Sequence, residues 1–128
     1  EHGLGEPVRV EGDFSADAGC LGCAVLLGDH PQLSALFCFN DHMAIGALHE
    51  ARRLGRRVPD DLSIVGFDDN ELAAFSEPGL TTVAQPLEQL GEQALALALA
   101  LIAGDEVAAQ PLLLPTLVVR DSTAALAG

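Results

Sequence analysis

Two adjacent carboxylates, Asp68 and Asp69, follow a short apolar run and are the first candidates for chemistry. The run at residues 63–67 contains the β-branched Ile64 and Val65 and is too short for a helix, so it predicts a strand buried on both faces. In open parallel α/β sheets, ligands bind at the carboxyl ends of the strands. The pair therefore predicts a binding site, and the simple alternative is a solvated turn capped by an Asx side chain.

Three more strands are predicted, and each is followed by a residue that can bind a ligand. The strands lie at residues 7–10, 35–39 and 81–84. The residues that follow them are Phe14, Asn40 with Asp41, and Gln85. An aromatic ring stacks on the C–H faces of a polyhydroxylated molecule, and amide and carboxylate oxygens accept hydrogen bonds from its hydroxyls. The set predicts a crevice for such a ligand.

Helices are predicted between these strands. They cover residues 15–27, 41–54, 70–75 and 87–102, and a last strand is predicted at 112–119 with a frayed tail at 120–128. Alternating strands and helices imply an α/β fold, a Rossmann-like parallel sheet with right-handed crossovers. The helix at 87–102 is apolar nearly all round, so we expect it to be buried on more than one side.

The composition excludes several classes of partner. The chain has 128 residues, 49% of them hydrophobic, and a formal net charge of −13, with no Lys. A surface that holds phosphates is basic, so we expect this segment not to touch nucleic acid itself. No apolar run is long enough to cross a membrane, and no secretory signal stands at the start. The first residue is Glu1, which indicates that the true N-terminus is missing.

No convincing catalytic set is present. Cys20 and Cys23 form a C-x-x-C that falls within a predicted helix on its core-facing side, so we expect buried, inert thiols and no metal site. The three cysteines are an odd count, which favours a reducing compartment and a cytoplasmic location. His42 and His49 stand about two helical turns apart, too far for one metal ion. No glycine-rich phosphate loop occurs, and we expect no cofactor and no enzyme activity.

Four segments, in this order, resemble the lactose/galactose repressor (LacI/GalR) family of bacterial transcription regulators. They read FCFNDHMAIGAL, VPDDLSIVGFDD, PGLTTVAQPLEQLGEQA and LVVRDST, and the resemblance runs from about residue 12 to residue 123. It implies a type I periplasmic-binding-protein-like effector domain, two Rossmann-like lobes joined by three crossovers, here incomplete. In that family an upstream helix-turn-helix domain binds operator DNA, and a sugar-like or nucleoside-type effector binds between the lobes.

The resemblance also assigns roles to individual residues. Phe14 matches the family's ring-stacking aromatic residue, and Asn40 or Asp41 together with Asp68 match its hydroxyl-binding residues. Gln85 sits at the crossover to the other lobe. The family's effector-binding arginine has no counterpart in this chain, so the resemblance implies that the effector site is incomplete here.

The same resemblance divides the chain between two lobes. Residues 1–85 would form part of the C-terminal lobe, residues 86–109 a helix of the N-terminal lobe, and residues 110–128 the return strand and tail of the C-terminal lobe. Most of the N-terminal lobe is absent from this division. We therefore expect the sheet to have an open edge.

Self-association is expected because operators of this family are read by dimers. Ile45 lies about 100° from the core stripe of its helix, Leu48 borders both faces, and Phe75 is placed beside that helix by the resemblance. Together they predict a modest apolar interface in a homodimer. The alternative is a stray exposed isoleucine and a phenylalanine tucked into the core.

Two other functions remain open at this point. A periplasmic sugar-binding protein of a transporter shares the same fold. An aspartate-dependent phosphoryl acceptor would use Asp41, Asp68 and Asp69, but the chain has no lysine to bind a phosphate. The most complete match is a LacI-type regulator, a repressor that works as a dimer.

Overall fold

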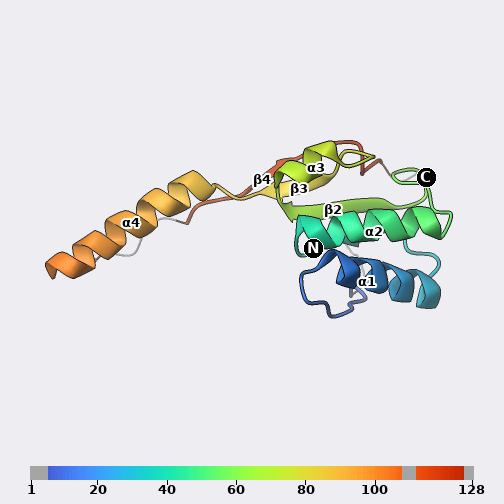
Figure 1. Cartoon of the computed structure of the whole chain (residues 1–128), viewed down its shortest axis with the longest axis horizontal. Coiled ribbons are helices and arrows are strands. Elements are labelled where there is room, and N and C mark those ends of the chain that lie inside the picture. The colour runs from blue at the N-terminus through green and yellow to red at the C-terminus, as the bar shows by residue number, and fades with distance from the viewer. Residues whose placement is uncertain (1–5, 108–111, 126–128) are drawn as a thin grey trace.

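The computed structural model describes residues 6–107 and 112–125, in which helices and strands alternate. In chain order the elements are α1 (Ala16–Asp29), β1 (Ala35–Phe37), α2 (Asp41–Arg53), β2 (Ser63–Asp68), α3 (Glu71–Phe75), β3 (Thr81–Ala84), α4 (Leu87–Ala103) and β4 (Thr116–Val118). The α/β prediction is confirmed. Figure 1 shows α2 lying along β2, α1 lying along α2, and α4 extending away from this body.

The four strands form one sheet in the order β1-β2-β3-β4. The pairs β1–β2 and β2–β3 are parallel, as predicted, but β4 is antiparallel to β3. Because α4 runs away from the sheet, the chain returns to it at the carboxyl end of β3 and must run back in the opposite direction (Figure 1). The sheet is therefore mixed, and its last strand has three residues rather than the eight predicted at 112–119.

The core lies on one face of the sheet, where α1 and α2 cover it. Leu36 of β1 and Ile64 of β2 point into this layer together with the apolar stripe of α2, and all are buried. The opposite face is open in this chain, because Phe37 is 57% exposed and Phe39 more so. The prediction that β1 and β2 are buried on both faces is therefore wrong for the described residues.

Helices α1 and α2 cross closely because each has a glycine at the contact. A Cβ atom on Gly19 would overlap the carbonyl of Met43, and one on Gly46 would overlap the carbonyl of Ala16. The close approach buries Cys23, as predicted, and leaves Cys20 half-buried with its thiol donating to the Gly46 carbonyl at 3.2 Å. Only glycine permits such a backbone approach between two helices.

Helix α4 begins after Pro86 and ends at Gly104, whose φ of +82° is the left-handed conformation typical of a helix end. None of its residues is buried, so the prediction of a helix buried on more than one side is wrong in this chain. The apolar pattern predicts a covering layer, and no described helix or strand packs extensively against α4. None of the described helices is both long and apolar enough for a bilayer crossing.

The two ends of the described chain also differ from expectation. Residues 7–10 form no strand, because no neighbouring strand pairs with them. A frayed tail was predicted at 120–128, but the part of it that the structure describes, residues 120–125, is tied to the sheet. Ser122 is fully buried, its hydroxyl accepts from Thr81 N at 2.8 Å and donates to the Ile64 carbonyl at 2.6 Å. This serine joins the starts of β2 and β3.

Candidate functional site

The carboxyl ends of β1, β2 and β3 lie at the same edge of the sheet, as the sequence predicts. Asp68 ends β2 opposite Ala84 of β3, so Gln85 follows at the same level. The Gln85 side-chain amide donates to Asp68 Oδ1 at 2.8 Å. The structure therefore brings Asp68 and Gln85 together. The second carboxylate oxygen of Asp68 makes no side-chain hydrogen bond to a described residue.

Phe14 and Asn40 form a second part of this edge. The Asn40 side-chain amide donates to the Phe14 carbonyl at 2.9 Å, while Asn40 Oδ1 accepts from Met43 N at 2.8 Å and caps α2. One side chain thus fixes both the start of α2 and the loop that carries Phe14. The Phe14 side chain is 62% exposed, so its ring is available for stacking.

Asp41 does not belong to the exposed part of the site. Its side chain is fully buried, Oδ2 accepts from Asn70 N at 2.8 Å, and Oδ1 accepts from Thr82 Oγ1 at 2.5 Å. Both carboxylate oxygens are used inside the fold, where the first turn of α2 packs over Gly66. Asp41 is a structural residue in this geometry, and we remove it from the set of candidate effector contacts.

The backbone is strained at the same edge. Among the described residues, the non-glycine positions with positive φ are Phe14 (+68°), Asp68 (+116°) and Asp69 (+57°). Such conformations cost of order 1–3 kcal/mol each and persist where the surroundings hold them. All three lie at the edge where the sequence predicts the site, and residues in such conformations are concentrated at functional sites.

Asp69 makes an ion pair that sequence reasoning missed. Arg120 Nη2 donates to Asp69 Oδ1 at 2.7 Å, and Arg120 Nη1 donates to the Leu80 carbonyl at 2.8 Å. Both charged side chains are about three-quarters buried. Arg120 was assigned to a frayed tail, although it lies within the segment LVVRDST, which carries part of the family resemblance.

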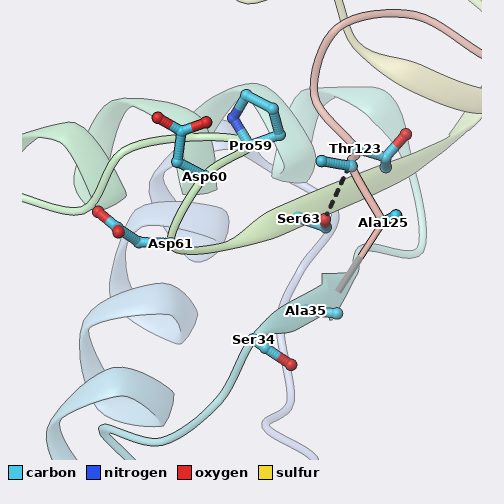
Figure 2. A pocket seen from close by; sticks show the side chains of 9 residues that line it. Ser34, Ala35, Pro59, Asp60, Asp61, Ser63, Thr123 and Ala125 are labelled. Carbon is cyan, nitrogen blue, oxygen red and sulfur yellow. Dashed lines mark hydrogen bonds between the residues drawn. The ribbon is translucent and has the colours of Figure 1, made fainter. Parts of the chain in front are cut away.

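A separate cavity lies at the opposite, amino end of the strands (Figure 2). It has a volume of about 310 Å³, and its lining includes Ser34, Ser63 and the loop residue Asp61. The Asp61 carboxylate is already paired with Arg57 at 2.7 Å, and the Ser63 hydroxyl accepts from Ala124 N. Because the Asp61 carboxylate and the Ser63 hydroxyl are engaged and the cavity lies away from the converging strand ends, we assign no ligand to it.

The cysteines have the environment of structural thiols. Burial raises the pKa of Cys38 to about 12 and that of Cys23 to about 11, and it also raises the pKa of Cys20. Thiols with raised pKa values are protonated at neutral pH and react slowly. In the described ranges, no three His, Cys, Asp or Glu side chains are grouped so that they could hold a metal ion.

The three residues predicted to form a dimer interface differ in exposure. Phe75, at the end of α3, is 85% exposed, and Leu72 beside it is also exposed. Ile45 is half-buried and packs against the core, and Leu48 is buried within the core. The apolar patch at this surface therefore centres on α3, and a dimer interface that includes Ile45 and Leu48 stays a prediction.

Comparisons with known proteins agree with this architecture. The profile of the periplasmic binding protein-like domain matches residues 5–123. The HTH-type transcriptional repressor CytR of Escherichia coli (strain K12) is 45% identical over 119 residues, which are 91% of this chain and 35% of the relative. The chain belongs to the LacI/GalR family.

Solved structures of the LacI/GalR family share the fold. The lac repressor dimer bound to operator and the anti-inducer ONPF matches with a TM-score of 0.82 and 36% identity, over 89% of this chain and 40% of that one. The transcriptional regulator CelR in complex with cellobiose matches with a TM-score of 0.80 and 38% identity, over 87% and 34%. The chain thus spans about a third of the length of the curated relatives it matches.

Proposed function

We propose that this chain is the effector-binding and self-associating part of a LacI-type transcriptional regulator, a repressor. The observation that carries the proposal is the edge of the sheet where Phe14, Asn40, Asp68 and Gln85 meet. Two of these four residues, Phe14 and Asp68, have positive φ, a conformation rare elsewhere in the described chain. Strain held at a set of ligand-binding side chains supports a binding site.

The arrangement suits a sugar or a similar polyhydroxylated molecule. In the proposed site, the Phe14 ring stacks on the C–H face of the ligand, and Asn40 and Asp68 bind its hydroxyls. Gln85 orients Asp68 through their 2.8 Å hydrogen bond. Two solved relatives contain disaccharides, CelR with cellobiose and a LacI family regulator from Arthrobacter with lactose. No step in this function requires catalysis or a cofactor.

The division between two lobes is part of the proposal. Residues 1–85 and 110–128 would belong to the C-terminal lobe, and residues 86–109 to the N-terminal lobe. Helix α4 supports this, because its apolar surface has no covering layer in the described chain. A second lobe packed on α4 would also close the crevice over Asp68 and Phe14.

The proposed dimer interface centres on Phe75 and Leu72 of α3. Ile45 and Leu48 of α2 would support it from beneath, since α3 contacts α2 and Arg52 donates to the Glu77 carbonyl at 2.8 Å. Two-fold symmetry would place α3 of one protomer against the same surface of its partner. Exposed apolar patches of this kind are typical of interfaces.

Operator DNA would be bound by a helix-turn-helix domain outside this chain, in the cytoplasm. The formal charge of −13 makes the described surface unsuitable for phosphates. The alternative function, a periplasmic sugar-binding protein, has less support because the relatives are named as transcriptional regulators and repressors.

Binding of DNA by the intact protein tests this proposal. Fluorescence anisotropy with DNA from upstream of its own gene, with and without cellobiose, lactose or ribonucleosides, should show DNA binding whose affinity changes with one of these compounds. The 128-residue chain alone is the control and should not bind the DNA. An intact protein that binds a sugar but not this DNA would favour the transporter function instead.

A further inference from the structure

Three consecutive residues at the carboxyl end of β2 are each tied to a different part of the chain. The three residues are Asp68, Asp69 and Asn70, and none of their partners is a neighbour in sequence. The hydrogen bonds are Gln85 Nε2 to Asp68 Oδ1 (2.8 Å), Arg120 Nη2 to Asp69 Oδ1 (2.7 Å) and Asn70 N to Asp41 Oδ2 (2.8 Å). The turn that carries the candidate site is therefore held at three separate points.

Arg120 is the most firmly fixed of these partners. Besides Asp69, its guanidinium donates to the Leu80 carbonyl at 2.8 Å, and its backbone N–H donates to Thr81 Oγ1 at 2.9 Å. It is thus attached to the start of β3 as well as to the turn after β2. A guanidinium with two fixed donors holds a carboxylate in a defined direction.

We propose that Arg120 and Asp69 are positioning residues that hold the Asp68 carboxylate in place for the effector. This inference rests on the proposed function of Asp68. Asp69 is at φ +57° and Asp68 at +116°, and a turn in this conformation relaxes unless its side chains are held. Asp69 itself does not face the ligand as a free group, because Arg120 already binds one of its oxygens.

Asp68 and Asp69 are also tied to chain segments on either side of α4 and β4. Gln85 lies just before α4, and Arg120 lies just after β4, the strand that follows α4. The position of Asp68 therefore depends on contacts with two segments that are distant in the sequence.

The opposing interpretation is an ion pair that only adds stability. The chain provides a comparison pair, because Arg57 Nη2 and Asp61 Oδ1 are also 2.7 Å apart and the Asp61 side chain is 29% exposed, against 26% for Asp69, although Arg57 is far more exposed than Arg120. This second pair lies at the amino end of β2, far along the strand from Asp68. A purely stabilising pair would affect unfolding without affecting the Gln85–Asp68 hydrogen bond.

The test is the hydrogen exchange of the Gln85 side-chain amide, measured by NMR on the 128-residue chain. Asn adopts positive φ readily, so Asp69→Asn keeps the backbone and removes the ion pair. We expect exchange to become roughly three- to tenfold faster, the size expected for loss of one hydrogen bond. Asp61→Asn should leave the exchange rate of the Gln85 amide unchanged. Arg120→Lys, which keeps the charge, should raise this rate less than Arg120→Gln does.

Unchanged Gln85 exchange in folded Asp69→Asn would overturn the inference, and so would an equal effect of Asp61→Asn. If Asp69→Asn does not fold, the comparison of Arg120→Lys with Arg120→Gln decides, and equal exchange in both variants would overturn the inference. The proposed function is tested separately by cellobiose and lactose binding to intact Asp68→Ala protein. A normal affinity there would reject Asp68 as a ligand contact without changing the outcome at Gln85.

Discussion

The hydroxyl of Thr82 donates to the buried carboxylate of Asp41 at 2.5 Å and ties the first residue of α2 to the middle of β3. The second Asp41 oxygen accepts from Asn70 N, at the start of α3. One buried side chain thus sets how α2, β3 and the turn after β2 sit together. Because Asn40 precedes Asp41, the two hydrogen bonds of Asp41 also hold Asn40 at the candidate site.

Replacing Asp41 with Ala should destabilise the chain by about 3 kcal/mol, because Asn70 N and the Thr82 hydroxyl lose their buried partner. Asp41→Asn should cost much less, since its amide group can accept from Asn70 N and donate to Thr82 Oγ1. Urea unfolding followed by circular dichroism measures both. Asp17→Ala is the control, an exposed acid in the first turn of α1. Equal losses of unfolding free energy in Asp41→Ala and Asp17→Ala would show that the hydrogen bonds of Asp41 do not stabilise the fold.

Gly66→Ala should destabilise the chain by about 1–3 kcal/mol through overpacking. A Cβ atom there would overlap Asp41 Oδ1 and lie 3.0 Å from Leu80 Cδ2. Gly28→Ala is the matched control, because Gly28 lies within α1 with open space around it. That change should stabilise the helix by about 0.5–1 kcal/mol. Thermal unfolding compares the two, and a neutral Gly66→Ala would mean that α2 does not pack closely on β2.

Much of this architecture can be predicted from local sequence. Ser15, Asn40 and Asn70 cap α1, α2 and α3, and their side chains make the hydrogen bonds that the residue types predict. The short apolar runs form parallel strands because helices of suitable length connect them. The convergence of Asp68 with Gln85 follows from the same topology.

Local sequence patterns do not predict contacts between residues that are distant in the sequence. Burial of Asp41 depends on Thr82, and the ordered end of the chain depends on Ser122 between β2 and β3, partners about 41 and 58 residues away. The apolar pattern of α4 predicted burial, which was wrong for the described chain, because a helix is buried only when another layer covers it. Arg120 was likewise missed because its partner, Asp69, lies 51 residues earlier.

Acid stability should depend on the Arg57–Asp61 pair. Hydrogen bonds from Arg57 lower the pKa of Asp61 to about 2, below its ordinary value of 3.8. A carboxyl group with a lowered pKa in the folded state stabilises the fold above its unfolded pKa and loses that contribution as the pH falls through the folded value. The contribution should therefore disappear between about pH 4 and pH 2. Arg57→Gln should raise the pKa of Asp61 in an NMR titration, and an unchanged titration would remove Arg57 as the cause.

Self-association should be sensitive to Phe75. Its side chain is almost fully exposed, so Phe75→Asp introduces a charge without disturbing the core. In the intact protein it should shift a dimer toward monomer, as measured by sedimentation. Leu21→Asp, at an exposed position on α1, is the control and should leave the dimer intact. Ile45→Asp should also shift the dimer toward monomer. It should in addition lower the stability of the fold, because Ile45 packs against the core.

Asp68 is the residue on which the proposed function depends most. Calorimetry on the intact regulator, with the tightest-binding compound from a panel that includes cellobiose and lactose, measures its contribution. Asp68→Ala should weaken binding by about 1–3 kcal/mol, since a ligand hydroxyl loses its charged acceptor. Asp60→Ala, before the amino end of β2, should bind as well as the parent. An affinity for Asp68→Ala equal to that of the parent would contradict an effector site at the carboxyl ends of these strands.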